Sequence, residues 1–253
     1  MIYGGNVLVY KPQPKMKMYK GYEVLNKADI EDNLDSMLTI LNRAKEEMTK
    51  PLMFHFVVEI TSPDDVPSKL TQSIKEKFTS EINKNHKARK ANGARARNTP
   101  KVEFFYSIET KARDSGELYN HIHIMFIVDA GHNVFGSKEL GILINKALNR
   151  IDGFEKLFFN GDFDIVKASD GYTFGEGFLK FRDKNSTIYA DDATFHDIRC
   201  HDLKTEFKDA VIRASYLCKS SQKKELPERY KGSNNQTFGG TRKLRATNSE
   251  KVA

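Results

Sequence analysis

The sequence has only two cysteines, Cys200 and Cys218, and no tryptophan. Two cysteines allow at most one disulfide, which excludes a disulfide scaffold and a cysteine-rich zinc module and favours a reducing compartment. No apolar run approaches the ~18 residues that a membrane span needs. Residues 1–15 also lack the apolar block of a secretory signal. We therefore expect a cytoplasmic protein without a membrane partner.

Acidic residues are missing from one stretch of a chain whose formal net charge is +7. Between residues 84 and 101 all seven charged residues are Lys or Arg, and residues 219–245 contain eight Lys and Arg against two Glu. Basic segments on an otherwise acidic chain are typical of proteins that bind a polyanion, because each cation placed on a phosphate releases counterions. A solvated charged surface is the alternative. The candidate nucleic-acid-binding residues are Lys84, Lys87, Arg89, Lys90, Arg95, Arg97 and, near the C-terminal helix, Arg213.

The 253 residues, 39% of them hydrophobic, suffice for one large domain with extensions. Helical spacing is found over 27–48, from 70 into the basic stretch, over 136–148, and from Asp202 to about 220. Strand patterns are found over 52–60, 101–109 and 119–128, with a turn at 114–117, and less clearly within 153–168 and 172–181. This order predicts an α+β fold in which helices flank a central antiparallel sheet.

Three regions are expected along the chain. Residues 1–50 form an N-terminal extension with one helix, in which Asp29 is the expected helix cap and residues 1–24 are extended or poorly ordered. Residues 51–220 form the main domain. Residues 221–253 are polar, have little apolar periodicity and are expected to form a basic tail.

The predicted strand 119–128 carries two histidines, His121 and His123, one residue apart. Side chains at positions i and i+2 of a strand point to the same face, so the two imidazoles can bind one metal ion. Alternatively, they are hydrogen-bonded residues inside a sheet. Glu109, which ends the preceding predicted strand, should pair opposite the start of the histidine strand and supply a third ligand, with Glu59 a weaker candidate. Two imidazoles and one carboxylate leave coordination positions open, as in catalytic sites.

The last predicted helix places Tyr216 away from its apolar stripe. At 100° per residue, Tyr216 lies about 160° from the centre of the stripe, on the same side as Lys219 and near Arg213. A phenol close to cations or a metal can attack a phosphodiester and form a covalent phosphotyrosine. An ordinary surface tyrosine is the alternative.

These motifs resemble those of the HUH endonucleases. His121-Ile122-His123 matches their histidine–hydrophobic–histidine triplet, and the run from Tyr216 to Lys219 (YLCK) matches their tyrosine, two spacers and lysine. Ser215-Tyr216-Leu217 and residues 237–242 (TFGGTR) are most similar to the replication initiators of filamentous phages and related plasmids or prophages. The resemblance covers residues 50–242.

The resemblance implies a ferredoxin- or RRM-like split βαβ sheet in residues 51–220 and a nickase that starts rolling-circle replication in a bacterial host. His121, His123 and Glu109 would hold Mn²⁺ or Mg²⁺, while Tyr216 cuts single-stranded DNA or an origin hairpin and retains a 5′-phosphotyrosine. Lys219 would steady the phosphate or the departing oxygen. The family also uses paired tyrosines, but Ile212 stands one turn before Tyr216, which favours a single nucleophile.

The sequence contains no G-x-x-x-x-G-K-[ST] phosphate loop, so a helicase and a polymerase of the host are expected partners. Two other functions are compatible with the residues. One is a non-catalytic nucleic-acid-binding replication or regulatory protein with structural histidines. The other is a metal oxygenase, because two histidines and a carboxylate also bind non-haem iron.

Overall fold

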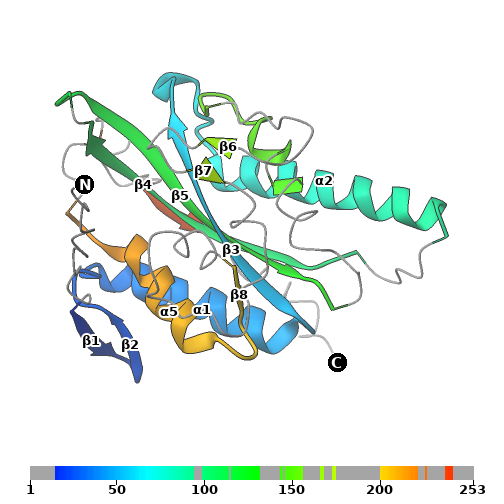
Figure 1. The fold of residues 1–253 in the computed structure, drawn as a ribbon, viewed down its shortest axis with the longest axis horizontal. Coiled ribbons are helices and arrows are strands. Elements are labelled where there is room, and N and C mark those ends of the chain that lie inside the picture. The colour runs from blue at the N-terminus through cyan, green and yellow to red at the C-terminus, as the bar shows by residue number, and fades with distance from the viewer. Residues whose placement is uncertain are drawn as a thin grey trace, which may run out of the picture.

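A five-stranded antiparallel sheet forms the centre of the computed structural model (Figure 1). Its strands, in spatial order, are β8 (Cys200–Asp202), β3 (Pro51–Ile60), β5 (Leu118–Asp129), β4 (Val102–Ala112) and β9 (Phe238–Gly240). The structure describes residues 15–93, 99–113, 115–131, 143–144, 146–155, 166–167, 173–174, 200–221, 226 and 237–241. With helices on both faces of the sheet, the predicted α+β class with a central antiparallel sheet is confirmed.

One face of the sheet is covered by α2 (Leu70–Ala91). Apolar side chains recur every four residues along this helix, which places them in one stripe, and all of them are buried: Leu70, Ile74, Phe78 and Ile82. They pack on the side chains of alternate strand residues, such as Phe54, Phe104 and Phe126, which are paired across the three central strands. This face is an apolar core, which confirms the predicted α2 stripe.

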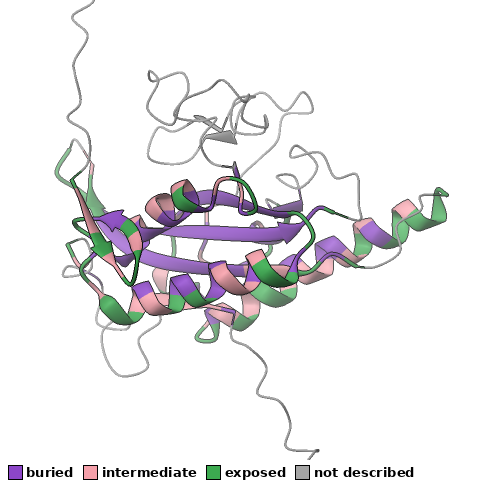
Figure 2. Ribbon diagram, turned by 90° about the horizontal axis from the view of Figure 1, so that it is seen from below, coloured by how far each residue is buried: buried purple, intermediate pink, exposed green. Residues whose placement is uncertain are grey.

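The other face is covered by α1 (Glu31–Glu47) and by α5 (Phe207–Ser215) with the 3₁₀ turn η3 (Tyr216–Cys218). The intervening strand residues, among them Met53, Phe105 and Met125, point towards these helices. In Figure 2 the strands are coloured almost entirely as buried, whereas the helices combine buried, intermediate and exposed positions. Alternate residues of the same strands thus point to opposite faces of the sheet.

Three predicted boundaries are wrong. The last helix does not begin at Asp202, because this residue ends β8 and α5 begins five residues later at Phe207. The α-helix also does not continue to residue 220, because it ends at Ser215 and η3 follows. Asp29 does not cap α1, whose N-cap position is held by Ile30.

The two predicted extensions contribute ordered structure. In the N-terminal extension, β1 (Met16–Tyr19) pairs with β2 (Tyr22–Leu25) in a hairpin. Within the predicted tail, β9 adds an edge strand to β4. A Cβ atom at Gly240 would lie 2.7 Å from the side chain of Ile40 and 2.9 Å from a backbone oxygen of β4. Glycine at this position therefore allows the edge strand to approach the sheet and α1 closely.

Part of the prediction lies outside the described residues. Of the expected helix 136–148, residues 143–144 and 146–148 are described and helical. The expected strands within 153–168 and 172–181 are represented by β6 (Val166–Lys167) and β7 (Thr173–Phe174), which pair with each other. The 3₁₀ turn η1 (Pro63–Asp65) precedes α2. Among the described helices, none combines the length and apolarity needed to cross a membrane.

Candidate metal centre and its neighbours

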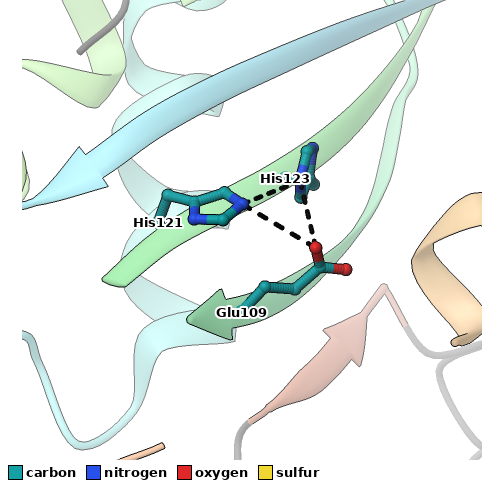
Figure 3. A group of neighbouring side chains, drawn as sticks. All are labelled: Glu109, His121 and His123. Atoms are coloured by element: carbon teal, nitrogen blue, oxygen red, sulfur yellow. Dashed lines mark hydrogen bonds and ion pairs between the residues drawn. The ribbon is translucent and has the colours of Figure 1, made fainter. Parts of the chain in front are cut away.

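The hairpin formed by β4 and β5 sets the positions of three possible ligands. Its tight turn includes Gly116, whose φ of 84° lies in the region that glycine adopts without strain. The resulting register places Glu109 directly opposite His121, as predicted. His123 lies two residues further along β5 and points to the same face, so all three side chains converge (Figure 3).

The distances within this group fit a bound ion. Nε2 of His121 and Nε2 of His123 are 3.1 Å apart, and Oε2 of Glu109 lies 3.7 Å and 3.3 Å from them, respectively. Ligands about 2.1 Å from a shared ion, at right or tetrahedral angles, would be about 3.0–3.4 Å apart. Both distances that involve His123 lie in this range, and the 3.7 Å distance from Glu109 to His121 is slightly longer. In addition, Oε1 of Glu109 is buried and accepts no hydrogen bond from the described residues. The three residues therefore form a group that could hold a metal ion.

Burial and neighbouring charges place the three side chains in metal-binding protonation states. Burial alone would raise the pKa of Glu109, but His123 and Lys219 outweigh it and lower that pKa to about 2. Burial, with His123 nearby, lowers the pKa of His121 to about 3, and burial also lowers the pKa of His123. At neutral pH the carboxylate is therefore ionised and both imidazoles are neutral, which are the forms that bind metals.

Lys219 connects this group to Tyr216. Its Nζ lies 2.9 Å from Oε2 of Glu109, and the lysine is only 2% exposed. The same Nζ lies 3.4 Å from the centre of the Tyr216 ring. The Tyr216 ring is in turn 5.3 Å from the ring of His123, at an interplanar angle of 70°. The nucleophile and lysine expected from the sequence thus lie next to the candidate ligands.

Tyr216 lies on the side that the helical spacing predicted, but it is not a surface residue. It is half-buried and packs against the apolar cluster under α1 and α5. Lys219 contacts its ring, as expected from the spacing, and Arg213 reaches His55, next to His123. The side of the helix away from the apolar stripe therefore faces the histidines of the sheet instead of solvent.

His55 and Arg213 form a second layer behind His123. Nε2 of His55 lies 3.0 Å from Nδ1 of His123, and an Nη2 group of Arg213 donates to Nδ1 of His55 at 3.0 Å. A guanidinium can only donate, so a neutral His55 donates to His123, whose own proton then lies on Nε2. An ion bound through Nε2 would require this proton to move to Nδ1, so that His123 donates to Nε2 of His55 and the guanidinium of Arg213 gives up its contact with Nδ1 of His55. The contact nevertheless fixes the ring of His123 with Nε2 towards Glu109.

Two residues of this site were missed by the sequence analysis, His55 and Lys27. Nζ of Lys27 lies 4.3 Å from the centre of the Tyr216 ring. A histidine inside the apolar run of β3 is a detectable signal, because such positions are rarely polar without a partner. Lys27 lies in the loop before α1, and nothing in its sequence neighbourhood marks it.

Glu59, the weaker candidate ligand, has another partner. It also lies opposite His121, on the β3 side of β5. However, its Oε1 accepts a hydrogen bond from Arg113 at 2.6 Å and forms an ion pair with it. The described structure therefore places Glu109, rather than Glu59, within the candidate metal group.

The basic residues separate into two sets. Arg213 lies at the metal group, whereas Lys84, Lys87, Arg89 and Lys90 lie on α2, which covers the opposite face of the sheet. The C-terminal half of α2 extends beyond the sheet (Figure 1). Lys84 forms an ion pair with Glu81 at 3.0 Å. Arg95 and Arg97 lie outside the described residues.

Comparisons with known proteins do not assign a family or a function to the chain. No protein-family model, curated protein or solved structure matches the chain. Function must therefore be inferred from the residues and their geometry.

Proposed function

We propose that the chain is a metal-dependent endonuclease of the HUH type, which nicks single-stranded DNA through a covalent bond to Tyr216 and so initiates rolling-circle replication. The observation that carries this proposal is the position of the Tyr216 ring, 5.3 Å from the ring of His123 and 3.4 Å from Nζ of Lys219. Two motifs separated by more than 90 residues meet at one point, as the reaction requires.

The order of the strands supports the same family. α2 connects β3 to β4, and β5 lies between these two strands and is antiparallel to both. β8, which follows in the chain, lies on the other side of β3. This order supports the proposed ferredoxin-like split βαβ arrangement, in which HUH endonucleases place their histidine triplet on a central strand.

The proposed residues have separate roles. Glu109, His121 and His123 would hold Mn²⁺ or Mg²⁺, which as a bound Lewis acid would draw charge from the scissile phosphate. The phenol oxygen of Tyr216 forms a bond to phosphorus while the bond from phosphorus to the 3′ oxygen breaks. The phenol loses a proton and the 3′ oxygen gains one, which leaves a 5′-phosphotyrosine and a free 3′-hydroxyl.

Lys219 has a defined place in this scheme. Its ammonium group neutralises Glu109 and contacts the Tyr216 ring, so it holds the nucleophile at the ligand group. The phosphotyrosine bond conserves the energy for rejoining the strand, and the reaction needs no nucleotide triphosphate. Host helicase and polymerase would separate the strands and extend the 3′-hydroxyl.

The test is a search for the covalent adduct. The protein is incubated with Mn²⁺ and labelled single-stranded DNA from the replicon that encodes it, and the products are separated under denaturing conditions. We expect labelled protein whose DNA is attached to Tyr216, as mapped by mass spectrometry. Tyr216→Phe should form no adduct but should still bind the DNA.

Two results would contradict the proposal. If the unmodified protein binds DNA but forms no adduct with either Mn²⁺ or Mg²⁺, the chain is a binding protein with structural histidines. If Tyr216→Phe forms the adduct as readily as the unmodified protein, the nucleophile is another residue. Oxygen-dependent turnover would instead indicate a metal oxygenase.

A further inference from the structure

The loop before α1 is attached to the turn that carries Tyr216. The backbone N–H of Leu25 donates to Oγ of Ser215 at 3.0 Å, and that of Ile30 donates to the carbonyl oxygen of Cys218 at 3.0 Å. These two contacts lie on either side of Tyr216 in the sequence. The loop before α1 is therefore hydrogen-bonded to the segment that carries Tyr216 and forms part of the site.

A third attachment fixes the end of this loop. Asp29 accepts hydrogen bonds from the backbone N–H and the hydroxyl of Ser220, at 2.7 Å and 2.5 Å. The pKa of Asp29 is lowered, because these hydrogen bonds from Ser220 outweigh the effect of burial. Asp29 thus acts as a bridge between the loop and the residue after Lys219, instead of capping α1.

Lys27 lies between these attachments and faces the reacting side chain. Its Nζ is 4.3 Å from the centre of the Tyr216 ring, where Lys219 already contributes a second ammonium group. The Lys27 residue is exposed, but partial burial of its amine lowers the pKa of that amine. The carboxylate of Glu109 raises this pKa, and the guanidinium of Arg213 lowers it further. The ammonium group of Lys27 therefore interacts electrostatically with Glu109 and Arg213 at the same site.

The two lysines differ in whether their ammonium groups are paired with a carboxylate. Lys219 is buried and paired with the carboxylate of Glu109. Within the part of the chain that the structure describes, Lys27 makes no ion pair, and the residue is exposed to solvent. A cation at the nucleophile that has no carboxylate partner is suited to an incoming anion.

We infer that Lys27 is a further catalytic residue, whose ammonium group contacts a non-bridging oxygen of the scissile phosphate during attack by Tyr216. This role rests on the proposed function. Lys27 keeps its proton throughout and adds no covalent step. It stabilises the negative charge that grows on the phosphate oxygens while the bond from Tyr216 to phosphorus forms and the bond to the 3′ oxygen breaks.

The test compares three variants of the full-length chain. Lys27→Gln removes the charge, and Lys27→Arg keeps it with a different geometry. Lys208→Gln is the matched control, since Lys208 is an exposed lysine in the first turn of α5. Adduct formation is measured in single-turnover experiments with Mn²⁺ and single-stranded DNA, and the Kd for the same DNA is measured at the same salt concentration.

We expect Lys27→Gln to slow adduct formation by about 10² or more, as for loss of one charged donor at a transition state. Its Kd should change only a few-fold, Lys27→Arg should recover part of the rate, and Lys208→Gln should match the unmodified protein. A Lys27→Gln rate equal to that of the unmodified protein would overturn the role of Lys27 and leave the proposed function intact. Absence of any adduct with the unmodified protein would overturn both.

A structural role for Lys27 would give a different pattern. Lys27→Gln would then lower the midpoint of urea unfolding. Adduct formation would be slow because the loop before α1 no longer holds the turn that carries Tyr216. Unchanged unfolding together with a slow rate supports contact with the phosphate. Lowered stability with a rate that recovers at lower temperature would overturn it.

Discussion

The two faces of the sheet differ in what they bury. The face under α2 buries an apolar cluster in which the rings of Phe78 and Phe126 lie 4.5 Å apart. The face under α1 and α5 also has apolar residues, but it buries Glu109, His121 and Lys219 beside them. Buried ionisable groups are costly, whereas apolar contacts contribute most of the stability of a domain. The apolar face thus stabilises the fold. That stability offsets the free-energy cost of the ionisable groups buried on the other face.

The largest effect should follow from breaking the buried ion pair. Glu109→Leu leaves the ammonium group of Lys219, 2% exposed, without its carboxylate. We expect a loss of about 3–5 kcal/mol in the free energy of unfolding, measured by urea denaturation in the presence of EDTA. Calorimetry with Mn²⁺ should show no binding.

The double variant Glu109→Leu/Lys219→Met serves as the control for this prediction. It removes both charges, so most of the lost stability should return while metal binding remains absent. Equal stability of the two variants would show that the ion pair is not the cause.

A substitution on the apolar face should lower stability without changing metal binding. Phe78→Ala removes a fully buried ring from the cluster under α2 and should cost about 3–5 kcal/mol. The affinity for Mn²⁺, measured at a temperature at which the variant is folded, should be unchanged. A large loss of affinity would show that the two faces are not independent.

His55 should affect the metal site without being a ligand. His55→Phe removes the partner of Nδ1 of His123, and loss of such a contact lowers metal affinity by about 10- to 100-fold. His86→Phe is the matched control, because His86 is a buried histidine on α2, at the other face. Equal Mn²⁺ affinities of the two variants in calorimetry would remove the positioning role of His55.

The smallest effect concerns acid stability. The folded pKa of His121, about 3, lies below its ordinary value of 6.5, so the unfolded chain binds more protons between these pH values. Stability is therefore fully present above pH 6.5 and falls as the pH decreases. His121 should account for a loss of about 1.4 kcal/mol at pH 5.5.

Urea unfolding in EDTA at pH 7.5 and pH 5.5 measures this loss. His121→Leu should show a pH effect smaller by that amount, because the remaining groups titrate in both proteins. An identical pH effect in the two proteins would show that His121 is not held in its neutral form by the fold.

Local patterns in the sequence were sufficient for the central elements. Alternation along β5 placed both histidines on one face, and the short turn at Gly116 fixed the register that brings Glu109 opposite His121. The spacing of apolar residues in α2 likewise identified its buried stripe. These features depend on the periods of strands and helices, which any short segment displays.

Contacts between distant segments were not predictable in this way. The helix pattern placed Tyr216 beside Lys219, but it did not show that this side faces His123 or that Lys219 is buried against Glu109. Lys27 reaches Tyr216 over almost 190 residues of sequence, and β9 was taken for part of a tail.

The sequence by itself therefore determined the three central strands of the sheet, their register at the histidine hairpin and the ligand types, since these follow from local periodicity and turn chemistry. Only the tertiary structure decided which cations surround Tyr216 and which histidine supports His123. Those choices depend on charges and hydrogen bonds between segments that meet only in the folded chain, where burial strengthens each interaction and makes each unpaired group costly.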